Sequence, residues 1–540
     1  MLGSVTAEAA SRFGDSALLV REDGESLSYT DLDRLSDELA VGLRGRGMRE
    51  GDVLALLVAS GPAYVVAYVA AAKIGAVTAG VNERLSTPEK LACLAVARPA
   101  LVIADSDSES SIDSDLSLAA AGHAGPESAH DVLRVESGAR VTDLYADIRA
   151  HGESPATLPV DPDRPVAIVF TSGTTGLPKG AVFCGKQLEA IGEIDGGRRF
   201  GGGGRGLGST SMAHLATMTK LPQTIRGGGT TFLMRRWTPG QALRMVERHR
   251  ITSLGGIPTQ VALMLRHDDF GSTDLSSVRA IALGGGPSTP ALVRETRERF
   301  GVPVVVRYTC TEAGVGTGTM PDDPFEDSEE TVGRARAGIE LSIRDPEAQM
   351  LPDGEIGEVC LRSDAVMAGY FRDPEATAAV MTNDGAVRTG DLGWIDERGR
   401  LRLCGRSKEM YVRGGYNVFP LEVESVLCEH PGVAHVAVSP RTDQVMGEIG
   451  VAVVVPVDPS APPGLDELRG FADGRLAHHK LPEDLLYVDD LPRTAMEKVD
   501  RRRLQAMVAT GTSNATIAPN TGIPGKEPGD TAQPDKWPDK

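Results

Sequence analysis

The chain has 540 residues, of which 41% are hydrophobic and only 4% aromatic, and its formal net charge is −19. A chain of this length can form three or four packed cores. The excess of acidic residues argues against nonspecific binding to nucleic acid or to acidic membranes. The six cysteines lie far apart and form no C-x-x-C pair, which predicts reduced thiols in the cytoplasm. No apolar run reaches about 18 residues and no signal peptide is visible, so we expect neither a membrane span nor export.

Helix and strand patterns alternate through the first hundred residues. The pattern predicts three helices and two strands, with Thr30 as the first N-cap: helices at 27–46, 67–79 and 89–97, and strands at 53–58 and 100–104. The alternation resumes between residues 241 and 306. It predicts an α/β fold whose large N-terminal domain, residues 1–404, is built from doubly wound, mainly parallel β/α sheets.

The pattern changes near residue 392. Short strands at 358–362 and 400–404 lead into an α+β pattern: helices near 421–429 and 465–478, and strands at 433–439, 451–455 and 485–488. About a hundred residues in this pattern predict a small C-terminal domain over 409–508. Residues 105–131 and the tail 509–540 contain little that a core could bury, so we predict that both are disordered.

A loop rich in hydroxyls and glycines lies between Ile168 and Gly180, reading I-V-F-T-S-G-T-T-G-L-P-K-G. Its donors and cation are Thr171, Ser172, Gly173, Thr174, Thr175 and Lys179. Backbone amides near glycines, hydroxyls and a lysine are the groups that hold a polyphosphate. It is not a Walker A loop, because Pro178 precedes the lysine and Gly180 follows it. The loop predicts a polyphosphate site, with a mobile surface loop as the alternative.

Glycine-rich stretches occur at two further places. Gly285 and Gly286 stand in L-G-G-G-P after an apolar run, where bare backbone can press against a flat base or an acyl chain. Residues 196–208 are also rich in glycine, but no helix pattern follows closely, which favours a flexible connector over a second phosphate cradle. Three arginines in or beside that connector are able to touch an anionic ligand: Arg198, Arg199 and Arg205.

Three more stretches carry candidate site residues. Y-T-C-T-E-A-G supplies the aromatic ring of Tyr308 and the carboxylate of Glu312, which can hold Mg²⁺ beside phosphates. R-T-G-D-L-G contains Asp391, which can accept hydrogen bonds from two sugar hydroxyls, and L-P-R-T-A-M-E-K-V-D contains Lys498. Each is weak alone, since Tyr308 is equally typical of a core and Asp391 of a turn or a helix cap.

Together and in this order, these stretches resemble the adenylate-forming superfamily of acyl-CoA synthetases, luciferases and peptide-synthetase adenylation domains. The resemblance covers residues 10–507, is closest to acyl-CoA ligases, and extends to G-R-S-K (405–408) and G-G-Y-N-V-F-P (414–420). It implies a two-step reaction in which a carboxylic acid and Mg·ATP give acyl-AMP, whose AMP is then displaced by the thiol of coenzyme A.

The resemblance also implies roles for individual residues. Residues 171–180 would cradle the β- and γ-phosphates, and Gly285 and Gly286 would border the nucleotide. At the nucleotide, Tyr308 would stack on adenine, Thr311 would contact the α-phosphate, Glu312 would bind Mg²⁺, Asp391 would bind the ribose, and Arg406 would contact ribose or phosphate. Lys498 would stabilise the transition state, and His214 would gate the acyl site. The small domain would be mobile about a hinge at 405–408 that includes Lys408, and the face that binds pantetheine would contain Gly414, Gly415 and Tyr416.

Three positions depart from the family pattern. Glu497 stands before Lys498 where members usually carry Gly, Thr309 replaces a frequent Gly, and Ser211-Met-Ala-His214 replaces Pro-x-Phe-His. The lost aromatic at Ala213 indicates a roomier acyl site that suits a bulky acid. The carboxylate of Glu497 can attract the lysine and repel a triphosphate, although a solvated Glu is an equal alternative.

We therefore hypothesise that thioesterification is intact and that adenylation is weak or lost, so that a partner adenylating enzyme supplies acyl-AMP. Two alternatives stay open: loading of a carrier protein in trans, and a non-catalytic relative that binds an adenylate. The motifs identify neither the acid nor the oligomeric state.

Overall fold

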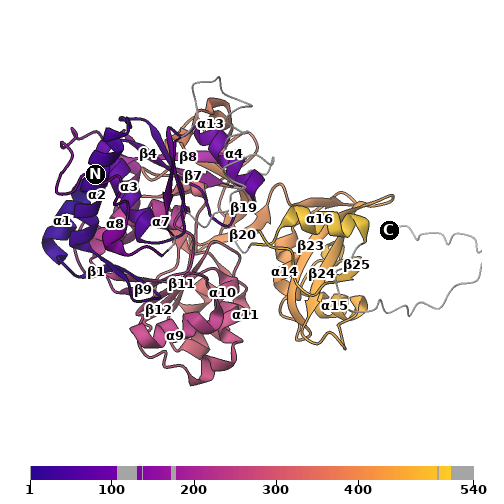
Figure 1. Cartoon of the computed structure of the whole chain (residues 1–540). Helices are drawn as coiled ribbons and strands as arrows, with labels where there is room; N and C mark the ends of the chain where they lie inside the picture. Colours follow the sequence, from indigo (N-terminus) through magenta and orange to yellow (C-terminus); the bar gives the residue numbers. More distant parts are fainter. Residues whose placement is uncertain (1, 106–130, 137, 172–177, 495–497, 512–540) are drawn as a thin grey trace, which may run out of the picture. The chain divides into compact units, whose positions relative to one another are not determined.

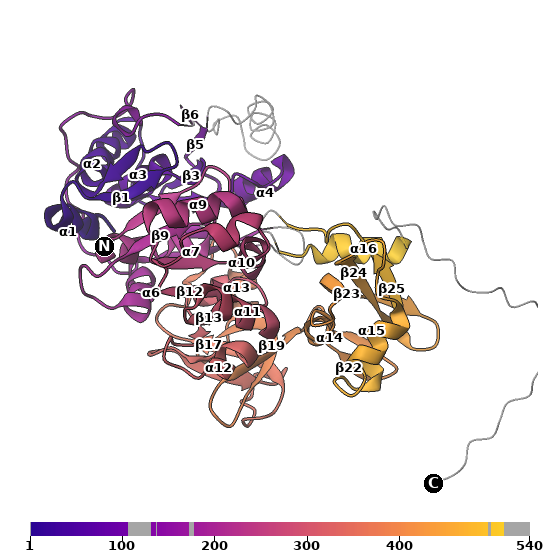
Figure 2. The same ribbon diagram turned by 90° about the horizontal axis from the view of Figure 1, so that it is seen from below.

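The computed structural model describes residues 2–105, 131–136, 138–171, 178–494 and 498–511. Here the chain forms two compact units (Figure 1; Figure 2). The large unit comprises Met1–Tyr411, Asn417–Ser425 and Arg493–Lys498, and the small unit comprises Val412–Tyr416, Val426–Pro492 and Val499–Lys540. The segments predicted to be disordered lie almost entirely outside the described residues, and the hinge at 405–408 stays a prediction.

A seven-stranded mixed sheet forms one half of the large unit's frame. Its order is β18-β8-β7-β4-β3-β5-β6, with strands Gly369–Tyr370, Lys179–Cys184, Pro165–Thr171, Val77–Gly80, Val53–Leu57, Leu101–Asp105 and Asp131–Val135. The run from β7 to β6 is parallel, whereas β8 and β18 are antiparallel additions. Every residue of β3 is buried, as expected for a parallel strand covered on both faces.

A nine-stranded sheet forms the other half. Its order is β15-β14-β13-β12-β11-β9-β10-β1-β2, with strands Arg334–Ala335, Thr317–Gly318, Val304–Tyr308, Ala280–Gly284, Ser253–Gly256, Arg205–Gly208, Thr230–Leu233, Ala17–Arg21 and Ser26–Ser28. The strands from β13 to β1 are parallel, and β14, β15 and β2 are antiparallel at the edges. The predicted doubly wound architecture is therefore confirmed, with antiparallel strands added to each sheet.

Helices cover both sheets. Their bounds are α1 Leu2–Phe13, α2 Tyr29–Gly45, α3 Pro62–Ile74, α4 Thr87–Ala97, α6 Gly185–Gly196, α7 Leu215–Met218, α8 Leu221–Gly227, α9 Pro239–His249, α10 Pro258–Leu265, α11 Pro290–Phe300, α12 Phe325–Glu330 and α13 Pro374–Val380. The helices α9, α10 and α11 pack against one another beside strands β9 to β13 (Figure 1). Helix α3 is buried on nearly all sides, which explains why its sequence is apolar all round.

Two predicted boundaries are wrong for local reasons. The N-cap of α2 is Ser28 rather than Thr30, because the Ser28 hydroxyl accepts a hydrogen bond from the amide of Asp31. The helix predicted over 67–79 ends at Ile74, because Gly75 adopts the left-handed conformation at φ +77° and stops it. The strand β4 then takes over at Val77.

A four-stranded antiparallel sheet completes the large unit. Its order is β16-β17-β19-β20, with strands Glu340–Arg344, Gly357–Arg362, Val387–Ile395 and Leu401–Arg406. The register of β19 and β20 sets Asp391 opposite Arg406, so two predicted site residues face each other across one ladder.

The small unit is built around the long hairpin of β23 and β24. A five-stranded sheet contains β22 Tyr416–Val418, β21 Tyr411–Arg413, β24 Gly447–Pro456, β23 Val433–Asp443 and β25 Asp484–Tyr487. The helices of this region are α14 Pro420–Leu427, α15 Leu465–Ala472 and α16 Arg501–Thr510. Leu504 of α16 is fully buried against the sheet with Ala437 and Val453, which confirms the α+β prediction. The helix predicted over 465–478 is shorter, since it ends at Ala472.

Candidate active site

Asp391 is the centre of a hydrogen-bonded group in the large unit. One carboxylate oxygen accepts a hydrogen bond from the hydroxyl of Tyr308, and the other accepts one from Nε of Arg406, both at 2.8 Å. Asp391 is only 9% exposed, so the guanidinium compensates a carboxylate that is largely removed from water. Burial first, and then the charge of Asp391, raises the pKa of Tyr308, so its phenol stays protonated and donates.

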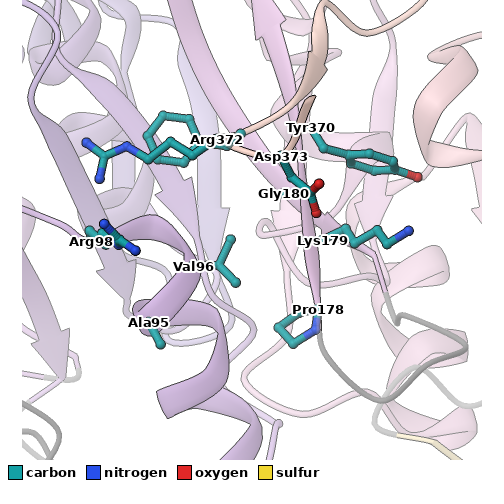
Figure 3. Close-up of a pocket in the computed structure, with 10 residues that line it drawn as sticks. Ala95, Val96, Arg98, Pro178, Lys179, Gly180, Tyr370, Arg372 and Asp373 are labelled. Carbon is teal, nitrogen blue, oxygen red and sulfur yellow. The ribbon is translucent and has the colours of Figure 1, made fainter. Parts of the chain in front are cut away.

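Glu312 is held by an aromatic residue that sequence analysis missed. It lies in the single-turn helix Thr311–Ala313, directly after β13, and its Oε1 accepts a 2.6 Å hydrogen bond from the hydroxyl of Tyr370. The ammonium of Lys179 lies 5.1 Å from the centre of the same ring. Figure 3 shows the side chains of Lys179 and Tyr370 extending to the same side. A conspicuous signal for Tyr370 was its place in G-Y-F-R-D-P, just before the helix α13.

A cavity of about 230 Å³ lies next to the first residues of β8. Arg98 at the end of α4 and Arg372 after β18 border it on one side, and Pro178 borders it on another (Figure 3). The side chain of Lys179 points away from this cavity, toward Tyr370 (Figure 3). Lys179 and Tyr370 nevertheless belong to the lining of the cavity, so the cavity borders the group formed by Glu312, Tyr370 and Lys179.

His214 is the N-cap residue of the short helix α7. Its Nε2 is buried and has no hydrogen-bond partner in the described part of the chain. Burial is the main cause that lowers the pKa of His214 to about 4, and the cations Lys498 and Arg84 add to it. The imidazole is consequently neutral at pH 7, and a buried polar atom without a partner is suited to meeting a ligand.

Lys498 belongs to the large unit by its contacts, although it stands near the end of the chain. Its carbonyl accepts a 2.8 Å hydrogen bond from the amide of Thr494. The residue keeps access to solvent, but surrounding protein atoms, and then repulsion from Arg406, lower its pKa, while Asp391 acts in the opposite direction. Lys498 thus shares its electrostatic environment with Asp391 and Arg406.

The other predicted site residues lie in several places. Thr171 ends β7 and pairs with Lys179 across the ladder, but Ser172, Gly173, Thr174 and Thr175 lie outside the described residues, as does Glu497. Gly285 and Gly286 directly follow β12, and Thr311 opens the turn that carries Glu312. Lys408 lies two residues after the end of β20.

The residues predicted to face coenzyme A lie in or next to the small unit's sheet. Gly414 and Gly415 join β21 to β22 with φ of +54° and +89°, a turn that other residues rarely adopt. Tyr416 is 59% exposed, and its ring stacks on that of His479 with centroids 4.5 Å apart.

The donor set at Glu312 fits a magnesium ion held mainly by a ligand. No group of three or more His, Cys, Asp or Glu side chains is arranged to bind a metal within the described ranges. One carboxylate beside a phosphate-binding loop is the usual arrangement for Mg²⁺, which keeps several waters and binds substrate phosphates. Among the described residues, no helix is both long and apolar enough to cross a membrane.

Comparison with known proteins gives the same assignment for both parts of the chain. The AMP-binding enzyme family matches residues 6–371, and the AMP-binding enzyme C-terminal domain matches residues 422–498. The feruloyl-CoA synthase of an Amycolatopsis species is 34% identical over 90% of this chain and 95% of its own length. The indoleacetate–CoA ligase of Aromatoleum aromaticum is 32% identical over 91% of this chain and 95% of its own length.

Solved structures match the fold along nearly the whole chain. ATP-bound MatB from Rhodopseudomonas palustris superposes with a TM-score of 0.83 at 28% identity, covering 94% of this chain and 99% of its own. The amide bond synthetase McbA from Marinactinospora thermotolerans gives a TM-score of 0.82 at 28% identity, covering 94% of this chain and all of its own.

The fold, together with these matches, defines an AMP-binding enzyme. The chain belongs to the AMP-binding enzymes of the adenylate-forming superfamily, as the family matches establish. Curated relatives of this chain include acyl-CoA synthetases and ligases.

Proposed function

We propose that the protein is an acyl-CoA ligase that converts a carboxylic acid into its coenzyme A thioester through an acyl-AMP intermediate. The observation that carries the proposal is the union, within one compact unit, of the Asp391–Arg406–Tyr308 group, the Glu312–Tyr370–Lys179 group and Lys498. The first group suits a nucleoside, the second suits a charged phosphate chain, and the lysine supplies a mobile cation.

The first step joins the acid to AMP. A carboxylate oxygen of the acid attacks the α-phosphorus of ATP, a new P–O bond forms, and pyrophosphate leaves. Negative charge develops around phosphorus, so donors that already point there lower the barrier. In the proposal, Lys498 and Thr311 supply such donors, Asp391 orients the ribose, and Glu312 holds Mg²⁺, which supplies further neutralisation of phosphate charge when bound.

The second step transfers the acyl group to sulfur. The thiol of coenzyme A attacks the acyl carbonyl, a C–S bond forms and AMP leaves, with the thiol proton going to solvent or to a base. The Gly414–Gly415 turn is our candidate for the surface along which pantetheine enters. His214 is neutral at pH 7 and is our candidate for the residue that gates the acyl site. Rotation of the small domain about Lys408 would switch the enzyme from the first step to the second, as domain motions do in many enzymes.

We further propose that Glu497 weakens the first step. A carboxylate about 4 Å from the ammonium of Lys498 attracts it by roughly 4 kcal/mol at an effective dielectric constant of 20. Removal of one transition-state donor typically costs about 10²–10³ in rate, so this attraction is large enough to offset the lysine's contribution. An adenylating partner enzyme would then supply acyl-AMP.

Purified protein tests both parts of this proposal. Pyrophosphate release from acid and ATP measures the first step, and acyl-CoA formation from synthetic acyl-AMP and coenzyme A measures the second. We expect the second rate to exceed the first, and Glu497→Gly to raise the first by at least about 10-fold. Lys498→Ala should abolish the first and spare the second. Fast pyrophosphate release by the unaltered protein would refute the impairment while leaving the ligase assignment intact.

We propose that the acid is bulky. Ala213 stands where the family commonly has an aromatic side chain. A methyl group placed on Gly255 of β11 would meet no atom within 4 Å, so space is open beside the strand that pairs with β12. A panel of polycyclic, alicyclic and flat aryl acids, analysed by mass spectrometry for acyl-CoA, tests this, and a strict preference for small aryl acids would refute it.

The names of two relatives point to other acceptors of the acyl group, which are our second candidates for the function of this chain. A fatty acid–acyl-carrier-protein ligase, ScoC of Streptomyces coeruleorubidus, is 30% identical over 89% of this chain, and McbA is an amide bond synthetase. Offering coenzyme A, a holo-carrier protein and an amine side by side to preformed acyl-AMP discriminates among them. Tight nucleotide binding without turnover of any acceptor would identify a non-catalytic adenylate-binding protein.

A further inference from the structure

Asp195, at the C-terminal end of helix α6, interacts with three cations. We call these four side chains the Asp195 cluster: Asp195, Lys220, Arg307 and Arg336. Asp195 accepts from Nη1 of Arg336 at 2.8 Å, and its other oxygen lies 2.5 Å from the ammonium of Lys220. Arg336 is also fixed by a 2.7 Å hydrogen bond from Nη2 to the carbonyl of Ile194. The side chains of Asp195 and Arg336 are 16% and 14% exposed, whereas that of Lys220 is 36% exposed.

The cluster contains more positive than negative charge. Burial lowers the pKa of Arg307, and the charge of Arg336 lowers it further, with Asp195 and Asp323 opposing. Asp323 is also an ion-pair partner of Arg334, at 3.9 Å. Three cations therefore share mainly the one carboxylate of Asp195, whose two oxygens are already engaged. Lys220 retains donors beyond its contact with Asp195, because an ammonium has three.

The cluster lies beside two elements of the candidate active site. Lys220 follows His214 by six residues along α7 and the turn after it, a span of roughly 9 Å at helical rise. A methyl group on Gly314, two residues after Glu312, would come within 3.0 Å of Ile191 on α6. The amide of Arg336 donates to the carbonyl of Gly316 in the same loop. The cluster is thus connected, by a short stretch of chain and by packing, to the elements that carry His214 and Glu312.

Helix packing alone does not require these charges. Helices α6 and α8 approach each other through Gly192 and Gly196, which lie against the side chain of Gln223. That contact is made by small residues and an amide, and Gly196 directly follows Asp195 in α6. A half-buried excess of cations beside it is costly unless an anion compensates it.

We propose that the Asp195 cluster binds a second anionic group at the far end of the acyl substrate, so that the preferred acid is a dicarboxylic or otherwise distally anionic acid. This inference rests on the proposed acyl-CoA ligase function. A site built to pair a charged group rejects the uncharged analogue, because the cations are then left without a partner. Lys220, the most exposed of the cations that contact Asp195, would contact the distal anion directly.

The test compares aliphatic α,ω-dicarboxylic acids with their monomethyl esters, in lengths that bracket about 9 Å. Both retain a reactive carboxylate, and only the diacid carries the distal charge. Binding is measured by isothermal titration calorimetry, and turnover by acyl-CoA formation with ATP and coenzyme A. At the best length we expect the diacid to be favoured over its ester by at least about 10-fold, the effect of one charge-assisted hydrogen bond.

Lys220→Met keeps the length of the side chain and removes its charge. We expect it to abolish most of the preference for diacids and to leave binding of the esters within about 3-fold, consistent with loss of one ionic contact. Lys186→Met is the matched control, because Lys186 also lies 2.5 Å from a carboxylate, that of Asp163, but is 53% exposed on the surface. It should leave the preference unchanged.

The outcomes separate this inference from the ligase assignment. Esters that bind and react as well as diacids at every length would overturn the inference, as would a Lys220→Met variant that weakens diacids and esters equally. Formation of acyl-CoA from the esters would in that case still support the ligase. Diacid-selective binding without any acyl-CoA, either from the acid with ATP or from its synthetic adenylate with coenzyme A, would support the anion site and count against the ligase.

Discussion

His214 and Asp391 show how burial changes what a single side chain can do. The imidazole of His214 is enclosed and has a cation nearby, so it holds its proton poorly. Asp391 is equally withdrawn from water, but Arg406 and Tyr308 satisfy both of its oxygens, so it is available as a fixed acceptor. His214 is therefore neutral and has a ring nitrogen free of hydrogen bonds within the described residues, whereas Asp391 is charged and held in place by two hydrogen bonds.

The depressed pKa of His214 predicts a pH dependence of stability. The folded value is about 4, against about 6.5 in an unfolded chain, so the unfolded state binds the proton first as pH falls. The free energy of unfolding should therefore fall by about 2 kcal/mol between pH 7 and pH 5 through this group alone. Urea denaturation of the natural protein and of His214→Gln measures it, and equal pH slopes for the two would contradict it.

Ion pairs and glycines fix how neighbouring elements meet. Asp327 on α12 is completely buried and accepts hydrogen bonds from Arg400 at 2.7 Å and from Arg334 at 2.8 Å. Burial alone would raise its pKa, but these arginines lower it, so the carboxylate stays ionised. On α2, by contrast, Gly42 lies so close to the backbone at Ile148 that a side chain does not fit.

Asp327→Ala should destabilise the protein by about 3–5 kcal/mol, because it removes a buried counter-charge and leaves the buried guanidinium of Arg400 with Asp396 alone. Glu8→Ala removes an ion pair with Arg12 that is about half exposed, and should cost less than about 1 kcal/mol. Chemical denaturation at pH 7 provides both values. Equal losses in the two variants would show that the network around Asp327 contributes no more than a surface pair.

Two glycines of α2 offer an internally controlled experiment. Gly42→Ala puts a methyl carbon 1.8 Å from the carbonyl oxygen of Ile148 and should cost about 2 kcal/mol. Gly45→Ala meets no atom within 4 Å and should stabilise the helix by up to about 1 kcal/mol. Thermal melting should move in opposite directions for the two variants; the same direction would contradict the packing argument.

The chain contains cores that are built separately. The large unit is organised around helices α2 and α3 and the two mixed sheets, while the small unit has its own cluster centred on Leu504 and Val453. Because each core excludes water on its own, a defect in one should act mainly on the unit that contains it. The unfolding transitions of the two units should therefore be analysed separately, rather than as one two-state transition of the whole chain.

Leu504→Ala and Leu35→Ala test this separation, since both side chains are fully buried but lie in different units. Each should cost its own unit about 2–5 kcal/mol. Differential scanning calorimetry should show one transition moving in the first variant and another in the second. Proteolysis with mass spectrometry assigns the transitions, and a common shift of the whole profile would show that the two cores unfold together.

The sequence by itself determined the local elements and the positions from which chemistry is delivered. Apolar periodicity predicted β3, α4 and β5 to within a few residues. Thr171 is the last residue of β7, and Glu312 lies four residues after the end of β13. These features depend on neighbours along the chain. The motif order likewise led to the family that the comparisons establish.

Only the tertiary structure decided which of these residues work together. The hydrogen bonds of Tyr370 with Glu312 and of Tyr308 with Asp391 join residues 58 and 83 positions apart, and strand pairing far along the chain brings them together. The low pKa of His214 and the ion pairs of Asp195 with Lys220 and Arg336 likewise depend on burial that no local pattern contains. Distance along the chain says nothing about dielectric surroundings, because those are set by everything that packs around a group.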